Sequence, residues 1–190
     1  CSDYDYYGSR RDGAFAEYIA VKEWNLVFFD DSLSYEEAAM CEPAAVALHA
    51  IGQASVGIGD TVAVFGAGPI GIMAAAIAKF AGARHVVITD LNEYRLDLAK
   101  KLGATRTVNL TKEKISDVMA ELGMKEGFDV GLEMSGAGSA LNDMIENMKH
   151  GGKIALLGLQ RTDATVDLET VIFNGLNLRG IYGRKVWDTW

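Results

Sequence analysis

Residues 61–71 constrain the fold of this chain most, because they run from an apolar segment through a glycine turn into a helix. The continuous apolar run at 62–65 suits a central parallel strand covered on both faces, since a half-exposed strand alternates apolar and polar residues. The turn has the spacing G-x-G-x-x-G, with its glycines at Gly66, Gly68 and Gly71. These glycines allow a tight turn, a close approach of backbone to a pyrophosphate, and close packing of helix on strand. Pro69 suits the first helical position, where its missing N–H costs nothing.

A glycine pattern alone is weak evidence, so the surrounding sequence decides its meaning. The motif opens a helix predicted at 69–80, with Ile70 on its apolar surface, and a second strand is predicted at 85–89. Asp90 follows this strand, 19 residues after Gly71, where about 20 are expected for a ribose-binding acid. A carboxylate there accepts hydrogen bonds from both ribose hydroxyls of NAD and repels the extra phosphate of NADP. A helix cap or turn is the alternative role, and the complete strand, turn, helix and strand unit favours the cofactor.

Arg95 leaves the choice of cofactor open. An arginine just beyond the second strand can accept the 2′-phosphate of NADP, or it can line the adenine edge. The remaining alternative is a solvated helix residue.

The composition limits the class of protein. The 190 residues are 49% hydrophobic and 23% charged, as in an ordinary soluble domain. The net charge of −8 argues against a nucleic-acid partner. No membrane span is expected, because the apolar run from Ile70 ends at Lys79, short of about 20 residues. Two cysteines, Cys1 and Cys41, make no disulfide framework, which favours a cytoplasmic location. Because it starts at cysteine, the chain is expected to be a piece of something longer.

Two regions of different character are predicted, at 1–45 and 46–190. The first lacks a strand–helix repeat, and 14–21 and 24–29 are expected to be short strands or extended segments. Ser34 and Glu37 have the capping-box spacing. A helix is therefore predicted over 35–51, broken or bent near Pro43.

From residue 60 onward, strands alternate with helices, which predicts a parallel sheet covered on both faces. The remaining helices are expected to begin after the caps Asn92, Thr111 and Asp167 and at Ser139, the last running to Lys149. The strands are expected at 62–65, 85–89, 105–109, 128–134, 153–157 and 176–182. The fold class is therefore α/β, a doubly wound parallel sheet of six strands (Rossmann).

Dinucleotides bind such sheets at the carboxyl ends of the strands. This rule places the glycine turn and Asp90 in one cleft with two later turns, Ser135–Gly136 and Leu157–Gly158. The pyrophosphate is expected at the N-terminus of the helix after Gly68, where N–H groups are free.

Several segments resemble the zinc-dependent medium-chain dehydrogenase superfamily, over the whole chain. They are D-G-A-F-A-E-Y at 12–18, Glu42-Pro43 with His49-Ala50, and the cofactor motif with Asp90. The Glu-Pro segment and 9–13 resemble the polyol branch, including sorbitol and galactitol-phosphate dehydrogenases. Residues 180–190 resemble the threonine dehydrogenases instead, so the two ends indicate different substrates.

The resemblance implies oxidation of a secondary alcohol, with hydride passing to C4 of the nicotinamide and a zinc ion polarising the alcohol. It makes 1–45 a remnant of a GroES-like β domain. It places Glu42 in or next to the catalytic zinc shell and Val46 against the nicotinamide. Cys1 stands at a structural zinc site that needs about four ligands, so zinc is expected to be absent from this piece. Cys41 is expected to be a small buried residue.

Two other classes stay open at this stage. One is a non-catalytic NAD-binding module, and the other is an S-adenosylmethionine-dependent methyltransferase, which also uses a glycine turn and an acid after the second strand. For the dehydrogenase, a homodimer or tetramer through the exposed sixth strand is expected. The piece alone is expected to bind NAD without turning over an alcohol.

Overall fold

The computed structural model describes residues 4–160, 163–185 and 187–189. The chain forms two compact units, Cys1–Ala38 and Ala39–Trp190. The boundary expected from sequence, between residues 45 and 46, falls inside a helix that belongs wholly to the second unit.

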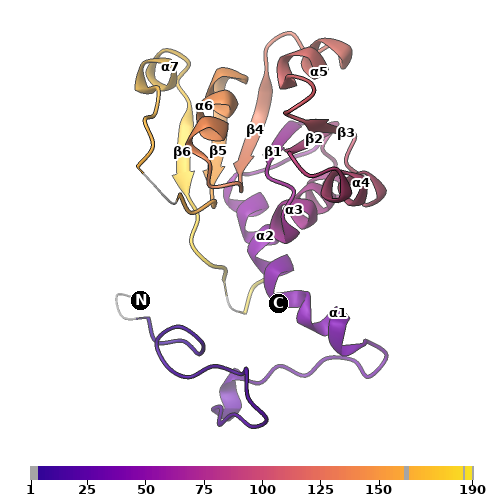
Figure 1. The fold of residues 1–190 in the computed structure, drawn as a ribbon, viewed down its shortest axis with the longest axis vertical. Coiled ribbons are helices and arrows are strands. Elements are labelled where there is room, and N and C mark those ends of the chain that lie inside the picture. Colours follow the sequence, from indigo (N-terminus) through magenta and orange to yellow (C-terminus); the bar gives the residue numbers. More distant parts are fainter. Residues whose placement is uncertain (1–3, 161–162, 186, 190) are drawn as a thin grey trace. The chain divides into compact units, whose positions relative to one another are not determined.

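The second unit contains one parallel sheet, and the six-stranded prediction is confirmed (Figure 1). Its order is β3-β2-β1-β4-β5-β6, which is the order of two mononucleotide-binding halves. The strands are β1 (Thr61–Phe65), β2 (His85–Asp90), β3 (Arg106–Asn109), β4 (Phe128–Glu133), β5 (Met148–Leu156) and β6 (Asn177–Gly180).

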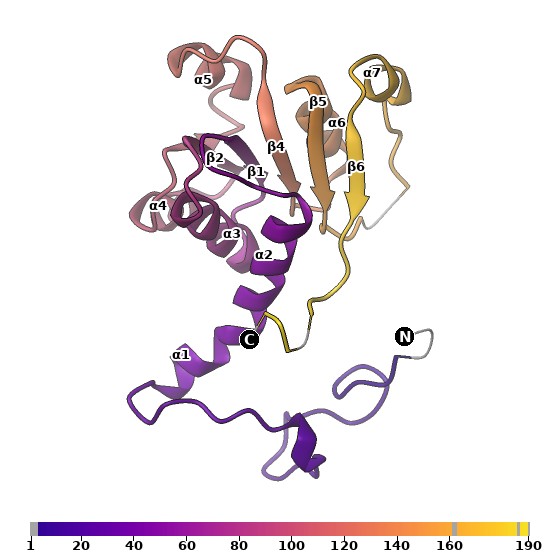
Figure 2. The same ribbon diagram turned by 180° about the vertical axis from the view of Figure 1, so that it is seen from behind.

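Helices connect the strands and cover the sheet. They are α2 (Cys41–Gln53), α3 (Pro69–Phe80), α4 (Glu93–Lys101), α5 (Ile115–Glu121), α6 (Gly138–Glu146) and α7 (Leu168–Phe173). Alternate residues of β1 point to opposite faces: Val62 and Val64 pack with α2, α3 and α4, whereas Ala63 and Phe65 pack with α5 and α6. Figures 1 and 2 show the sheet from its two sides. Both faces are therefore covered, as the continuous apolar run predicts.

The helix starts combine confirmed and corrected predictions. In α1 (Tyr35–Ala39), Ser34 Oγ accepts from Glu37 N at 3.2 Å and Glu37 Oε2 accepts from Ser34 N at 2.8 Å, so the capping box is confirmed. Asn92 and Asp167 cap α4 and α7 as predicted. Thr111 does not cap α5: its hydroxyl donates to Asn109 Oδ1, and the N-cap is Lys114. The helix starts later because the hydroxyl of Thr111 bonds to the nearby side chain of Asn109 instead of capping the helix.

The predicted break near Pro43 is confirmed. Helix α1 ends at Ala39 and α2 begins at Cys41. Proline has no N–H to donate to the carbonyl four residues earlier, so the helix cannot continue unbroken through this point.

The predicted end of α6 and the predicted start of β5 were wrong. The sequence predicts a helix to Lys149 and a turn at 150–152, but α6 ends at Glu146 and β5 already begins at Met148. Met148 pairs with Phe128 of β4, and the register shifts before Val130 pairs with Lys153. Pairing with a neighbouring strand overrides the local helical pattern, and the extra residues form an irregularity at the start of β5.

The first unit contains no strand within residues 4–38. The sequence predicts short strands or extended segments at 14–21 and 24–29: no strand forms there, the 3-10 helix Glu23–Asn25 overlaps the second segment, and Leu26 after it has extended backbone. Tyr7 and Arg11 make one isolated bridge. A strand needs a partner for its backbone N–H and C=O groups, and these residues do not pair.

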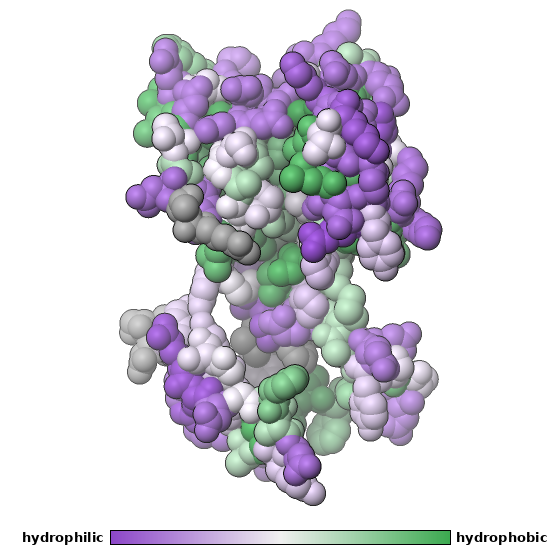
Figure 3. All heavy atoms as spheres, in the orientation of Figure 1, coloured by the Kyte–Doolittle hydropathy of each residue, from purple (hydrophilic) through white to green (hydrophobic). Residues whose placement is uncertain are grey.

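The surface of the second unit is mostly hydrophilic, with local apolar patches. On the face in Figure 3, apolar residues gather at upper left, over α7. The exposed side chains of this helix include Leu168, Ile172 and Phe173. In the described part of the chain, every helix falls short of the length and apolarity needed to cross a membrane.

Phe128 and Phe80 provide a test of the core. Phe128 is 0% exposed and Phe80, the last residue of α3, is 95% exposed. We expect Phe128→Ala to lower the free energy of unfolding by about 3–5 kcal/mol through the cavity it leaves. Phe80→Ala serves as the matched control, with an expected change of about 0.5 kcal/mol or less. Urea unfolding followed by circular dichroism measures both, and equal effects would contradict this assignment of the core.

Candidate functional site

The carboxyl ends of four neighbouring strands are joined by backbone hydrogen bonds. Gly66 N donates to Thr89 O at 2.9 Å, and Met134 N donates to Phe65 O at 2.9 Å. Leu157 N donates to Glu133 O at 2.9 Å. The glycine turn after β1, the end of β2 and the turns after β4 and β5 therefore lie along one edge of the sheet, as the sequence predicts.

The glycine turn has the conformation that its spacing requires. Gly66 has φ +105°, which disfavours any other residue, and a Cβ there would lie 2.9 Å from Ser135 N. A Cβ at Gly71 would overlap the carbonyl oxygen of Gly66. Gly68 has φ −71° and open space around it. The first and third glycines are therefore needed for the fold, whereas the second leaves room beside the N-terminus of α3.

Asp90 fixes this turn from the end of β2. Its Oδ2 accepts a hydrogen bond from Ala67 N at 2.7 Å, and its Oδ1 accepts from Leu91 N at 2.8 Å and Asn92 N at 2.9 Å. Arg95 Nη1 lies 4.0 Å from Oδ2. The side chain of Asp90 is 13% exposed. Asp90 therefore has a structural role in addition to any contact with a ribose.

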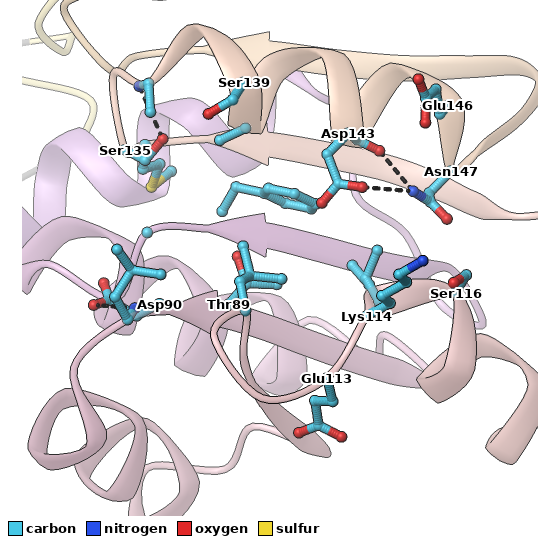
Figure 4. A pocket seen from close by; sticks show the side chains of 18 of the residues that line it. Thr89, Asp90, Glu113, Lys114, Ser116, Ser135, Ser139, Asp143, Glu146 and Asn147 are labelled. Carbon is cyan, nitrogen blue, oxygen red and sulfur yellow. Dashed lines mark hydrogen bonds between the residues drawn. The ribbon is translucent and has the colours of Figure 1, made fainter.

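A cavity of about 910 Å³ opens at this edge (Figure 4). The predicted residues that line it are Gly66, Gly68, Asp90, Arg95 and Ser135. The other predicted cofactor residues lie outside this lining. Pro69, Ile70 and Gly71 form the first turn of α3, Val46 lies on α2, and Gly136, Leu157 and Gly158 lie in the neighbouring turns.

Glu133 is a buried charged residue that the sequence analysis missed. It ends β4 and is 1% exposed. Its Oε1 accepts hydrogen bonds from Ser135 N at 2.9 Å, Ser135 Oγ at 2.5 Å and Gly136 N at 3.0 Å. A Cβ at Gly158 would overlap both Gly136 N and this carboxylate. Glu133 therefore shapes the turn after β4, and an acid at the end of an apolar strand, just as at Asp90, was the signal for it.

Glu42 lies in the first turn of α2 and pairs with Arg184, with Oε1 and Nη1 2.5 Å apart. Within the residues that the structure describes, no three His, Cys, Asp or Glu side chains come together as metal ligands. Cys1 lies outside the described residues. Cys41 is exposed, so the expectation of a buried residue was wrong: as the first residue of α2 it precedes the packed positions. These side chains do not fit a zinc site by themselves, and no step through zinc follows from them.

Comparison with known proteins decides the family. The model of the family described as "Zinc-binding dehydrogenase" matches residues 69–190. This chain belongs to that zinc-binding dehydrogenase family. Two curated relatives are L-threonine 3-dehydrogenases, from Pseudoalteromonas translucida (54% identical) and Idiomarina loihiensis (56% identical). Each match covers 96% of this chain and 53% of the relative. This family member therefore spans about half the length of the curated relatives it matches.

Solved structures of dehydrogenases share its fold. Galactitol-1-phosphate dehydrogenase from Escherichia coli has a TM-score of 0.87 at 31% identity, over 99% of this chain and 55% of that one. L-idonate 5-dehydrogenase from the same species has a TM-score of 0.85 at 31% identity, over 94% of this chain and 51% of that one. The resemblance to medium-chain dehydrogenases predicted from sequence is confirmed.

The glycine turn of this zinc-binding dehydrogenase chain gives a paired test. We expect Gly71→Ala to lower the free energy of unfolding by about 1–3 kcal/mol or more, because its methyl group overlaps backbone that cannot move freely. Gly68→Ala adds a methyl group in open space, and we expect a loss of about 1 kcal/mol or less from the helix cap. Urea unfolding measures both, and a Gly71→Ala variant as stable as Gly68→Ala would contradict the packing described.

Proposed function

We propose that this chain is the NAD-binding part of an enzyme that oxidises a secondary alcohol by transferring hydride to C4 of the nicotinamide. The observation that carries the proposal is the cavity in which the glycine turn, the N-terminus of α3 and Asp90 lie together. We infer L-threonine as the first substrate to test, because two curated relatives are L-threonine 3-dehydrogenases. This chain covers about half of the length of each. A polyol remains the second candidate, since the galactitol-1-phosphate and L-idonate enzymes share the fold.

The backbone of the chain supplies the binding of the phosphates. Gly68 is the N-cap of α3, where free N–H groups and the positive end of the helix dipole favour an anion. Open space around Gly68 lets a pyrophosphate come close to the backbone. Asp90 would accept hydrogen bonds from the ribose hydroxyls. Its carboxylate has more lone pairs than the three backbone N–H groups use.

We also propose that Glu42 belongs to the catalytic centre of the whole protein, near Val46 and the nicotinamide. Arg184 lies 142 residues from Glu42 in the chain and holds its carboxylate by a charge-assisted hydrogen bond of 2.5 Å. Arg184 belongs to the segment that resembles the threonine branch. The ion pair with Arg184 therefore positions the carboxylate of Glu42 without any contribution from a metal ion.

Two other functions have weaker support. Against a non-catalytic NAD-binding module stands the Glu42-Pro43 segment, which resembles the zinc-site segment of dehydrogenases and would have no use without a zinc site. A methyltransferase would bind S-adenosylmethionine, whose single nucleoside needs no pyrophosphate site at Gly68. Binding experiments with three ligands separate these functions.

We expect titration calorimetry to detect binding of NAD and to find weaker binding of NADP and S-adenosylmethionine. Asp90→Asn keeps the size of the side chain and one of its two acceptor oxygens but removes the charge that repels a 2′-phosphate. We therefore expect its preference for NAD over NADP to fall by about tenfold, equivalent to ~1.4 kcal/mol. Asp97→Asn, on an exposed position of α4, is the matched control and should keep the wild-type ratio. Binding of S-adenosylmethionine alone would refute the dehydrogenase proposal.

A second copy of the chain is the partner that we propose for the exposed sheet edge. Strand β6 is one of the two edge strands of the sheet, the other being β3, and among the described residues it pairs with β5 alone. Its unpaired backbone groups offer a template for another strand. The exposed apolar residues of α7, which precedes β6, add surface that association would bury (Figure 3).

Sedimentation velocity tests this association. We expect a dimer or tetramer whose fraction increases with protein concentration, because mass action favours the associated form. Phe173→Ser, on exposed α7, should shift the equilibrium toward monomer, whereas Phe80→Ser, on α3, should not. A monomer at the highest concentration would contradict the proposal.

A further inference from the structure

The cavity at the strand ends is larger than the part that the glycine motif accounts for. Asp90 lies at one end of its lining, and the opposite part is lined by Asp143 of α6, by the C-cap Asn147 after this helix, and by Lys114 and Ser116 at the start of α5 (Figure 4). Figure 4 shows Asp143 pointing into this space from α6, across from Thr89 and Lys114. None of these α5 and α6 side chains has a role in the phosphate and ribose contacts proposed above.

Asp143 is a poorly stabilised carboxylate. It lies in the last turn of α6, which contains no basic residue, so the negative end of the helix dipole opposes its charge. Partial burial raises the pKa of Asp143, the charge of Glu146 raises it further, and a hydrogen bond from Asn147 lowers it. That bond, from Nδ2 to Oδ1, is long at 3.2 Å.

The second carboxylate oxygen of Asp143 is available to a ligand. In the described part of the chain, Oδ2 accepts no hydrogen bond, and Asp143 forms no ion pair with Lys114 across the cavity. The described residues therefore supply no hydrogen-bond donor to Oδ2 of Asp143, and a ligand could supply one. Apolar side chains of Phe65, Leu110 and Ala140 line the same cavity and suit a flat ring.

We propose that Asp143 selects the base of the dinucleotide by accepting a hydrogen bond from the exocyclic amino group of adenine. The inference rests on the proposed function, because it assumes that the pyrophosphate lies at Gly68 and the ribose at Asp90. Gly68, Asp90 and Asp143 line the same cavity, so a base attached to a ribose at Asp90 would extend away from the phosphates toward the part that Asp143 lines. A 6-amino purine presents a donor at its far edge, whereas a 6-oxo purine presents an oxygen that an ionised carboxylate repels.

The experiment compares the binding of NAD with that of nicotinamide hypoxanthine dinucleotide, in which an oxygen replaces this amino group. For the wild-type chain we expect NAD to bind about tenfold more tightly or better, as a hydrogen bond to a charged group implies. Asp143→Asn keeps the shape but can present either a donor or an acceptor, so the ratio of the two dissociation constants should fall to within about twofold of one. Asp117→Asn, on an exposed position of α5 outside the cavity lining, should keep the wild-type ratio.

The possible outcomes separate this inference from the proposed function. Equal binding of the two dinucleotides by the wild-type chain would overturn the role of Asp143 while leaving NAD binding in place, and this measurement does not depend on the folding of a variant. An Asp143→Asn variant that keeps the wild-type ratio would overturn it as well. If the wild-type chain binds neither dinucleotide, the proposed function fails and the inference fails with it.

Discussion

The contact between Gly71 and the carbonyl oxygen of Gly66 determines how close α3 comes to β1. No side chain fits between them, so the first turn of the helix lies directly against the glycine turn. This packing holds the N-terminus of α3 at the edge of the sheet, where its N–H groups remain free for a ligand. The candidate site is therefore built largely from backbone around the glycine turn.

Two carboxylates stabilise the turns on either side of that contact. Asp90 accepts the N–H of Ala67 from the glycine turn, and Glu133 accepts N–H groups of Ser135 and Gly136 from the turn after β4. Each acid ends a buried strand and satisfies backbone donors that would otherwise be costly to leave unpaired. The two turns thus keep fixed shapes on both sides of β1, and the cavity between them is preformed.

The sequence predicted most of this arrangement, because its signals are local. The strands have continuous apolar runs, and the caps Ser34, Asn92 and Asp167 bond to residues three positions away. Predictions failed where a distant partner decided the outcome. Met148 joins a strand because Phe128 of β4 lies beside it and pairs with it.

The sequence by itself determined the strand, turn and helix around Gly66, the acid at Asp90, the doubly wound sheet and the family. Only the tertiary structure brought Glu42 to Arg184, put Glu133 under the Ser135–Gly136 turn and directed Asp143 into the cavity of the glycine motif. The physical reason is the distance along the chain over which each interaction acts. Apolar periodicity and capping act within a few residues, whereas a cavity is formed by side chains that packing brings together from distant parts of the chain.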